Sequence, residues 1–412
     1  MPLLSLARFL AAILSAALLA AGVYLLWSWY QGEWVLHPSG VYERFREGWR
    51  LWAGGGVLAW SLLGRLILPF LLAKGGGRPS NSERGRGEML AGATGSQLYV
   101  ERHGPRGGPI LVFTHGWGMD LTFWDYAKQD LADRFHLVLW DLPGLGRSKP
   151  PAGGEIAVAN FAADLAGLIA TLDRPAVLVG HSIGGMTLQT LVRDHPDAMD
   201  RVAGIVLLNT TYTNPLRTMI LSRLLLALQK PLLEPAMHLT IWLQPLVWLS
   251  KWQSYFSGSV HAGLRLGFGK FVTRSQLEHA ALLSTRAPPA IEAKGDLAMF
   301  HWDATNALAR LQKPLLVIGG DMDIVTKLEA SRAIAAETST AELRVVQGVN
   351  HMGPMERADL YNEAIAAFAL SVQPSATHDK LRRSRLDEPR VFDKDADAGT
   401  LVDPASSVNQ LH

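Results

Sequence analysis

The sequence of 412 residues contains no cysteine, so disulfide bonds and metal sites built from thiolates are excluded. An excess of either charge is also absent, because 39 lysines and arginines are balanced by 37 aspartates and glutamates. Without a basic excess, the composition gives no electrostatic reason to expect binding to nucleic acid. Any catalysis must therefore use oxygen and nitrogen groups, and we expect no cofactor, no metal and no nucleic-acid partner.

Charge is missing from one long stretch near the N-terminus, "FLAAILSAALLAAGVYLLWSWYQG", which begins at Phe9. The stretch is longer than the roughly 20 residues that cross a bilayer. Trp27, Trp29 and Tyr30 lie where an interfacial belt is expected. We therefore predict a transmembrane helix over residues 9–30. A cleaved signal peptide is the alternative, although the apolar run continues past the small residues that a cleavage site would need.

A second apolar run, residues 51–73, is interrupted by Arg65 near its middle. A lone arginine at that depth costs about 2.5–3.5 kcal/mol on insertion scales. The run is therefore either a second span or a helix lying in the interface. We favour a hairpin of two spans, so that residues 1–73 form a membrane anchor. Lysine and arginine are slightly denser outside the connecting loop than inside it, which predicts that both termini lie in the cytoplasm.

Residues 74–87, "KGGGRPSNSERGRG", are glycine-rich and without periodicity, which predicts a flexible linker. In residues 88–372, helical patterns alternate with apolar strand-like runs. The runs are "QLYVERHG", "PILVFTHG", "HLVLWDLPG", "AVLVGHS", "AGIVLLNTT", "PLLVIGGD" and "ELRVVQG". This alternation predicts an α/β fold in which helices cover both faces of a mostly parallel sheet. The polar residues 373–412 cannot bury a core, and we expect this tail to be disordered.

The stretch "VLVGHSIGGM" places Ser182 between a strand-like run and a helical pattern. Gly180 and Gly184 give the spacing G-x-S-x-G, which permits the crowded turn that lifts a serine hydroxyl above the end of a sheet. The N-terminus of the following helix would favour negative charge developing there. We therefore predict that Ser182 is a nucleophile if a base, an acid and an oxyanion hole exist elsewhere. An ordinary turn is the alternative.

Ligands of open parallel sheets bind beyond the carboxyl ends of the strands. The run "ILVFTHG" leads there into "HGWGMD", where the backbone amide of Trp117 would supply one oxyanion donor. The amide of Ile183, directly after the serine, would supply the other. Asp141, in "WDLPGLGRS", adjoins a turn, and we assign it a structural role because such carboxylates anchor their own loops.

The acid and the base are expected after the last two strand-like runs. In "PLLVIGGDMDIVT" two aspartates compete, and we choose Asp323 because Asp321 directly adjoins the tight glycine pair. His351 lies between a strand and a long amphipathic helix in "VVQGVNHMGPMERADLYNEAIAAF". There it could accept the proton of Ser182 while Asp323 fixes its tautomer and stabilises the imidazolium. The chain order serine, aspartate, histidine favours this role over that of a buried structural histidine.

Five motifs occur in order along residues 88–372: "HGWG", "DLPGLGRS", "GHSIGG", "GGDMDIVT" and "NHMGPMER". Through them the sequence resembles the α/β-hydrolase superfamily. The apolar N-terminus and "LLNTTYTNPLRTM" make it similar to membrane-anchored bacterial α/β hydrolases of unassigned substrate. The resemblance implies the α/β-hydrolase fold and the triad, and its membrane-anchored bacterial members favour an inner-membrane location. The distribution of lysine and arginine described above would put the catalytic domain on the cytoplasmic side. The resemblance implies no substrate.

Haloalkane dehalogenases and soluble epoxide hydrolases share this fold but have aspartate at the elbow, so Ser182 argues against both. Covalent acyl transfer remains. We expect a serine hydrolase, of esterase or lipase type, that cleaves an ester or related acyl bond through an acyl-enzyme. An acyltransferase or thioesterase with the same triad, and a noncatalytic binding module of the same fold, are the alternatives.

Residues 212–310 separate "LLNTT" from "PLLVIGG" by more than a crossover connection needs, which predicts a helical cap inserted after the sixth core strand. Its first half is dense in leucine and contains Trp242, Trp248 and Trp252, residues that favour the bilayer interface. The cap either packs over the active site as an ordinary lid or inserts partly into the bilayer. Together with the anchor and the short linker, it predicts a lipophilic acyl substrate that arrives from the membrane.

Overall fold

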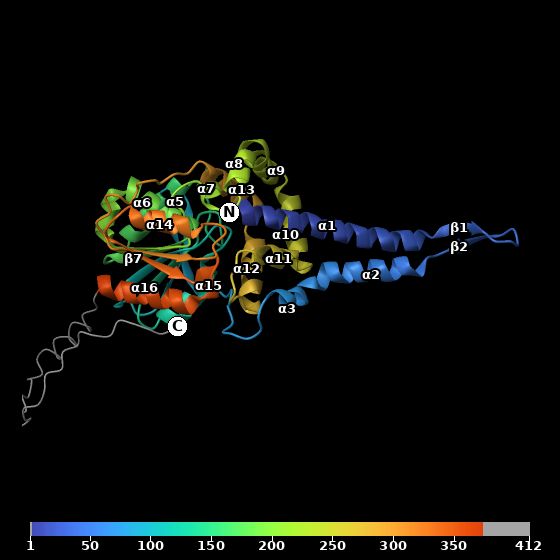
Figure 1. Ribbon diagram of the computed structural model, residues 1–412, viewed down its shortest axis with the longest axis horizontal. Coiled ribbons are helices and arrows are strands. Elements are labelled where there is room, and N and C mark those ends of the chain that lie inside the picture. The colour runs from blue at the N-terminus through green and yellow to red at the C-terminus, as the bar shows by residue number, and fades with distance from the viewer. Residues whose placement is uncertain (1, 374–412) are drawn as a thin grey trace, which may run out of the picture. The chain divides into compact units, whose positions relative to one another are not determined.

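The computed structural model describes the backbone of residues 2–373 and the side chains of residues 11–373 (Figure 1). The predicted tail, apart from its first residue, lies outside this range. An eight-stranded sheet consists of β3 (Gly87–Ala91), β4 (Gln97–His103), β5 (Ile110–Thr114), β6 (His136–Trp140), β7 (Ala176–His181), β8 (Val202–Leu208), β9 (Leu315–Gly320) and β10 (Ala341–Val346). Its order is β10-β9-β8-β7-β5-β6-β4-β3, and only β3 and β4 pair in antiparallel fashion with their neighbours. The predicted mostly parallel sheet is confirmed.

The sheet separates two apolar cores. Its covering helices are α4 (Asp125–Leu131), α5 (Val158–Ala170), α6 (Ile183–Asp194), α14 (Leu328–Ala336), α15 (Gly353–Glu356) and α16 (Ala358–Val372). In β5, Ile110 and Val112 belong to the core on the side of α5, α6 and α14, whereas Leu111 and Phe113 belong to the core on the side of α4 and α16 (Figure 1). Alternate residues of a strand point to opposite faces. The strands therefore read as continuous apolar runs because both faces are buried.

A helical cap follows β8, the sixth strand of the sheet in chain order. Its helices are α7 (Pro215–Thr218), α8 (Ser222–Leu228), α9 (Glu234–Trp242), α10 (Gln244–Phe256), α11 (Ser259–Arg265), α12 (Arg274–Arg286) and α13 (Pro289–Phe300). Pro235 and Pro245 lie in the first turns of α9 and α10, where a missing N–H breaks no helical hydrogen bond. Thr213 and Asp303 form an antiparallel bridge, so the chain leaves the sheet and returns to it at one place.

The N-terminal region is a helical hairpin that consists of α1 (Pro2–Gln31), β1 (Glu33–Leu36), β2 (Tyr42–Phe45), α2 (Gly48–Leu63) and α3 (Leu68–Leu72). Helices α1 and α2 lie side by side and are joined by the antiparallel pair β1 and β2 (Figure 1). Gly54 lets them approach closely, since a Cβ there would lie 3.0 Å from side-chain atoms of Leu25 and Leu26. Within residues 2–373, one helical segment, Ala11–Gln31, is long and apolar enough to cross a membrane by length and composition. A signal sequence would have the same properties, so the membrane anchor stays a prediction.

The predicted second span over residues 51–73 is not one continuous helix, because the chain forms α2, a 3₁₀ turn at Gly64–Leu66 and the short helix α3. Whether this region crosses a membrane stays a prediction. The break coincides with contacts to the cap. A Cβ at residue 64 would lie 2.3 Å from the carbonyl oxygen of Ser257, so only glycine fits there. The side chain of Arg65 lies 3.5 Å from the carboxylate of Glu278 in α12. The arginine thus has a partner in the cap.

The predicted linker, residues 74–87, lies along the hydrolase domain and the cap. Lys74 forms a parallel bridge with Thr273, and the backbone N–H of Ser80 donates to the hydroxyl of Ser275. These contacts leave the segment less freedom than its glycine-rich composition predicts. At its end, residue 87 already belongs to β3, an edge strand that the sequence patterns do not predict because its five residues lack a clear apolar alternation.

Candidate active site

Ser182 occupies the tight turn between β7 and α6. Its backbone has φ 59° and ψ −118°, a conformation that residues other than glycine rarely adopt. A Cβ at residue 180 would lie 2.6 Å from the backbone of Gly184, and a Cβ at residue 184 would lie 2.3 Å from the carbonyl oxygen of Thr114. The turn therefore leaves no space for side chains at Gly180 and Gly184, which is the physical reason for the G-x-S-x-G spacing.

The structure brings Ser182, His351 and Asp323 together. Nε2 of His351 lies 3.2 Å from Oγ of Ser182, and Nδ1 of His351 lies 3.0 Å from Oδ2 of Asp323. All three side chains are buried. Ser182 follows β7, Asp323 follows β9 and His351 follows β10, and these strands end at the same edge of the sheet.

Hydrogen bonds fix the Asp323 carboxylate. The backbone N–H groups of Val325 and Thr326 donate to Oδ1 at 2.8 Å each. The Thr326 hydroxyl and the Asn209 amide donate to Oδ2 at 2.8 and 3.0 Å. Burial alone would raise the pKa of Asp323, but the charge of His351 and these hydrogen bonds hold it below its usual value. Asp323 is therefore charged at neutral pH and can accept the Nδ1–H of His351.

The competing aspartate, Asp321, is exposed. Its carboxylate accepts a hydrogen bond from the backbone N–H of Gly348 at 2.6 Å and so holds the turn after β10. The geometry therefore favours Asp323 as the partner of His351.

The backbone segments that carry the two predicted oxyanion donors run next to the serine. Ile183 is the first residue of α6, so its backbone N–H has no partner within that helix. A Cβ at residue 116 would lie 3.5 Å from Cβ of Ser182, so the backbone that leads to Trp117 runs beside the serine. The indole of Trp117 donates to the carbonyl oxygen of Glu292 at 3.1 Å, which holds this loop against α13.

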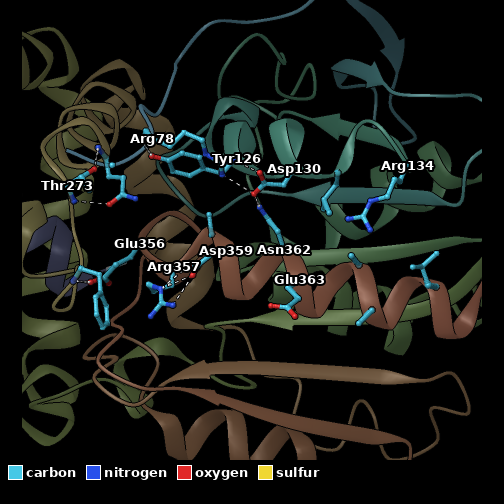
Figure 2. A pocket seen from close by; sticks show the side chains of 18 residues that line it. Arg78, Tyr126, Asp130, Arg134, Thr273, Glu356, Arg357, Asp359, Asn362 and Glu363 are labelled. Carbon is cyan, nitrogen blue, oxygen red and sulfur yellow. Dashed lines mark hydrogen bonds and ion pairs between the residues drawn. The ribbon is translucent and has the colours of Figure 1, made fainter. Parts of the chain in front are cut away.

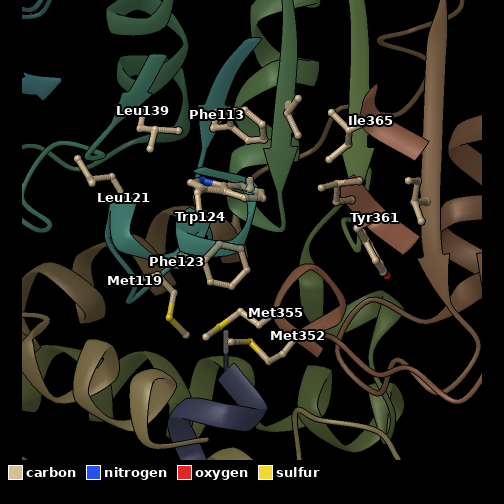
Figure 3. Close-up of a cluster of buried hydrophobic side chains, with 14 of the residues drawn as sticks. Phe113, Met119, Leu121, Phe123, Trp124, Leu139, Met352, Met355, Tyr361 and Ile365 are labelled. Carbon is tan, nitrogen blue, oxygen red and sulfur yellow. The ribbon is translucent and has the colours of Figure 1, made fainter. Parts of the chain in front are cut away.

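Apolar side chains surround the centre. Met119 and Phe123, which follow β5, lie beside Met352 and Met355, which follow His351 (Figure 3). The methionines and the phenylalanine are buried. Electrostatic interactions are stronger in such dry surroundings than in water.

Asp141 is buried in a cluster of charges with Asp120 and Arg84 of the predicted linker. Guanidinium nitrogens of Arg84 lie 2.7 Å from each carboxylate. Asp141 also accepts from the backbone N–H of Leu121 at 2.7 Å and from that of Arg147 at 2.8 Å. Burial raises the pKa of Asp141. Burial alone would also raise the pKa of Asp120, but the charge of Arg84 and hydrogen bonds from Thr122 together hold it below its usual value. These contacts agree with a structural role for Asp141. The ion pairs of Arg84 are not predicted from the sequence.

Further polar residues support the centre without having been predicted. Nε2 of His181 donates to the carbonyl oxygen of His351 at 2.9 Å, and its ring stacks on Phe123 at a centroid distance of 4.7 Å. Asn209, which donates to Asp323, accepts a hydrogen bond from the hydroxyl of Tyr361 at 2.7 Å. Asn209 directly follows β8, which lies between β7 and β9 in the sheet. A polar residue at the end of this strand is a signal in the sequence from which a role beside the triad could have been predicted.

A surface groove lies away from the candidate site. This groove of about 820 Å³ runs between Arg78, α4 and α16, and the ion pairs Arg78–Asp130 and Arg357–Asp359 lie along it (Figure 2). None of the predicted site residues lines it. Within the described part of the chain, no group of three or more histidines and carboxylates could hold a metal ion.

Known proteins are similar to this chain over the region that contains the site. A family model described as the alpha/beta hydrolase fold matches residues 109–358. The bifunctional esterase/perhydrolase of Acinetobacter calcoaceticus is 29% identical over 291 residues, which cover 67% of this chain and 97% of that protein. The non-heme chloroperoxidase of Streptomyces lividans is 27% identical over 291 residues, with the same shares of 67% and 97%.

A solved structure of similar fold is that of a thermophilic esterase from Thermogutta terrifontis. It has a TM-score of 0.56 and 23% sequence identity and covers 70% of this chain and 99% of the esterase. This likeness concerns the fold alone. The family model, in contrast, covers more than half of the chain and includes the elbow, the acid and the base loops. The chain therefore belongs to the α/β-hydrolase family and is an α/β-fold hydrolase.

Proposed function

We propose that the protein is a membrane-anchored serine hydrolase that cleaves an ester or related acyl bond of a lipophilic substrate. One observation carries the chemistry: a single imidazole, that of His351, lies 3.2 Å from the Ser182 hydroxyl and 3.0 Å from the Asp323 carboxylate. Serine hydrolysis by a triad requires this relay of hydrogen bonds. The esterase activity named for the relative from Acinetobacter calcoaceticus supports the same reaction class.

In the first half of the reaction, Ser182 Oγ attacks the carbonyl carbon of the substrate while Nε2 of His351 takes its proton. The charge of Asp323 stabilises the imidazolium. The oxyanion that forms accepts hydrogen bonds from the backbone N–H groups of Trp117 and Ile183, near the positive end of α6. His351 then gives the proton to the leaving oxygen, and Ser182 carries the acyl group.

In the second half, water replaces the leaving group. Nε2 of His351 takes a proton from this water as its oxygen attacks the acyl carbon. The same oxyanion donors stabilise the second tetrahedral intermediate. The bond to Ser182 Oγ breaks, the serine regains its proton from His351, and the free acid leaves.

The membrane part of the proposal rests on α1 and on the apolar surface of the cap beside it. Apolar side chains along α1 are exposed, including those of Val23 and Trp27, and Leu246 and Leu249 of α10 are exposed as well. A groove of about 600 Å³ between α1 and α10 is lined by both helices. Such a contiguous apolar surface suits a bilayer. With the anchor in a bacterial inner membrane, the catalytic domain would lie on the cytoplasmic side.

Labelling with a fluorophosphonate probe tests the chemistry. We expect the full-length protein in liposomes to be labelled, and Ser182→Ala to lose both labelling and about 10⁶-fold in kcat. Ser39→Ala, which removes an exposed hydroxyl from the turn between β1 and β2, is the control and should be labelled like the wild type. Labelling of Ser182→Ala at the wild-type rate would refute the nucleophile.

The lipophilic substrate needs a second measurement. We expect the wild type in liposomes to release acid faster from long-chain esters embedded in the same bilayer than from a short-chain ester in water. Equal or slower release from the embedded esters would contradict that part of the proposal while leaving the triad intact.

A further inference from the structure

An apolar cavity of about 370 Å³ lies inside the cap, and the N-terminal helix forms one of its walls. Its volume falls within the range of small-molecule sites. Apolar side chains of several helices line it, among them Ala12 and Ile13 of α1, Ala236 and Met237 of α9, and Ala293 and Phe300 of α13. The cavity therefore lies between a helix that is apolar enough to span a membrane and the cap of the hydrolase domain.

Hydrogen bonds hold α1 against the cap at this place. The hydroxyl of Ser15 lies 2.7 Å from that of Ser257 and donates to the carbonyl oxygen of Gln253 at 3.2 Å. One turn earlier, the hydroxyl of Ser250 donates to the carbonyl oxygen of Ala12 at 3.3 Å. Ala12 is buried as a result. The wall that α1 contributes is thus fixed by polar contacts and is part of the folded cap.

Helix α13 connects the cavity with the catalytic centre. Ala293 faces the cavity, while the carbonyl oxygen of Glu292 accepts the indole N–H of Trp117. A Cβ at residue 295 would lie 2.0 Å from the Trp117 ring, so the ring lies directly against this helix. The cavity and the predicted oxyanion loop therefore both contact α13.

The charged groups at the cavity are paired within the protein. The ammonium group of Lys251 lies 2.6 Å from the carboxylate of Glu292 and donates to the carbonyl oxygen of Ala287 at 2.6 Å. Asp296, the other carboxylate at the cavity, also takes part in interactions. Since the charges already have partners, the cavity selects for apolar shape and not for an ionic ligand.

The rim of the cavity opens toward the apolar outer surface. Ile13 of α1 and Leu232, which precedes α9, line the cavity and are about half exposed, at 50% and 52%. The neighbouring groove between α1 and α10 is also apolar and includes Leu246 and Leu249. A hydrocarbon chain that enters the cavity from this surface would therefore lie mainly against apolar side chains.

We infer that this cavity binds the aliphatic chain of the substrate's acyl group, and that α1 is part of the substrate site as well as an anchor. The inference rests on the proposed function. It names the class of substrate as a long-chain acyl ester, whose chain lies between α1, α9 and α13 while its carbonyl group lies at Ser182.

Filling the cavity from two different walls tests the inference. Ala12→Phe adds a ring from α1, and Ala236→Trp adds one from α9. The measured quantity is the ratio of kcat/KM for p-nitrophenyl tetradecanoate to that for p-nitrophenyl butyrate, with full-length protein in phospholipid nanodiscs. We expect each variant to lower this ratio by about tenfold or more, because the loss of two buried methylenes is enough for that change.

Leu14→Phe is the matched control, because Leu14 follows Ile13 on α1 but is exposed and does not line the cavity. We expect its ratio to equal that of the wild type. An unchanged ratio in both Ala12→Phe and Ala236→Trp would overturn the inference, and so would an equal fall in Leu14→Phe. Hydrolysis of the butyrate ester by each variant shows that it is folded.

A binding measurement separates failure of the cavity from failure of the proposed function. Ser182→Ala in nanodiscs is irradiated with a palmitate analogue that carries a diazirine at its methyl end, and the labelled peptides are identified by mass spectrometry. We expect label on Ala293, which is buried at the cavity and cannot meet bilayer lipid, and less of it after adding Ala236→Trp. Label confined to exposed positions of α1 would refute the cavity even if the triad is correct. Label on Ala293, together with a wild-type protein that hydrolyses neither the butyrate nor the tetradecanoate ester, would refute the proposed function and leave the cavity standing.

Discussion

The catalytic centre and the junction between the turn at Gly64–Leu66 and the cap both depend on polar contacts, but they differ in burial. Around His351 the hydrogen-bond partners are buried. At the junction, the ion pair between Arg65 and Glu278 leaves 34% and 37% of the two side chains exposed. A buried polar group without a hydrogen-bond partner destabilises the folded state strongly, whereas a partly exposed ion pair contributes little to its stability. The centre should therefore tolerate almost no change, while the junction can lose single contacts and remain folded.

The junction also shares its contacts among several partners. Glu278 accepts hydrogen bonds from Tyr255 and, at 2.7 Å, from Nε2 of His261, in addition to its pairing with Arg65. Burial alone would raise the pKa of Glu278, but the hydrogen bonds from His261 and Tyr255 hold it below its usual value. Burial and the contact with Glu278 raise the pKa of Tyr255 to about 12. Loss of Arg65 therefore leaves Glu278 with two other hydrogen-bond donors. In the catalytic centre, by contrast, one imidazole, that of His351, links Ser182 to Asp323.

Among the variants that test this contrast, the largest effect is expected for Asp323→Asn. An amide cannot hold the Nδ1–H tautomer of His351 or stabilise its imidazolium, and a comparable triad loses about 10⁴-fold in kcat. Steady-state hydrolysis of a butyrate ester would measure the change. Asp321→Asn is the matched control, since this aspartate is exposed, and we expect its kcat to change by about twofold at most. The reverse order would identify Asp321 as the acid.

The catalytic centre could be predicted from the sequence, whereas the contacts of Arg65 and Arg84 could not, and the difference has a physical cause. Ser182, Asp323 and His351 each follow a buried apolar run, and the parallel sheet brings the ends of those runs to one edge. The fold and the candidate site could therefore be predicted from short stretches of sequence. Arg65 and Glu278 are 213 residues apart, and Arg84 and Asp141 are 57 apart. No local pattern relates such pairs, so the break in the second apolar run and the binding of the linker could not be predicted.

A second large effect is expected for Arg84→Gln. This variant tests whether the loss of a buried ion pair of the linker is as costly as the loss of a buried contact in the catalytic centre. The change leaves the buried carboxylates of Asp120 and Asp141 without their guanidinium partner, and breaking a buried pair in this way costs about 3–5 kcal/mol. Urea unfolding at neutral pH would measure the loss. Arg86→Gln, at an exposed position two residues later, should stay within about 0.5 kcal/mol of the wild type. Equal losses in the two variants would show that Arg84 contributes nothing specific.

A smaller effect is expected from the titration of His181. Burial and the charge of His351 lower the pKa of His181 to about 3, from 6.5 for a free histidine. Between these values the unfolded chain binds a proton that the folded protein does not bind, so acid favours unfolding and stability falls as the pH decreases. His181→Gln can still donate to the carbonyl oxygen of His351 and does not titrate. We expect the variant to lose about 1–2 kcal/mol less stability than the wild type between pH 7 and pH 5. Parallel curves of unfolding free energy against pH would contradict this.

The smallest effect is expected at the junction, from a double-mutant cycle of Arg65→Gln and Glu278→Gln. Because both side chains are about one third exposed, the coupling between them should be below about 1 kcal/mol. Thermal unfolding of the full-length protein in nanodiscs would measure it. Glu278→Gln alone should cost more than Arg65→Gln alone, since Tyr255 and His261 each donate to a different carboxylate oxygen and an amide keeps only one acceptor oxygen. A coupling of several kcal/mol would mean that the Arg65 pair is as well shielded from water as the catalytic centre. The two regions would then differ only in how far apart in the sequence their interacting residues lie, and not in burial.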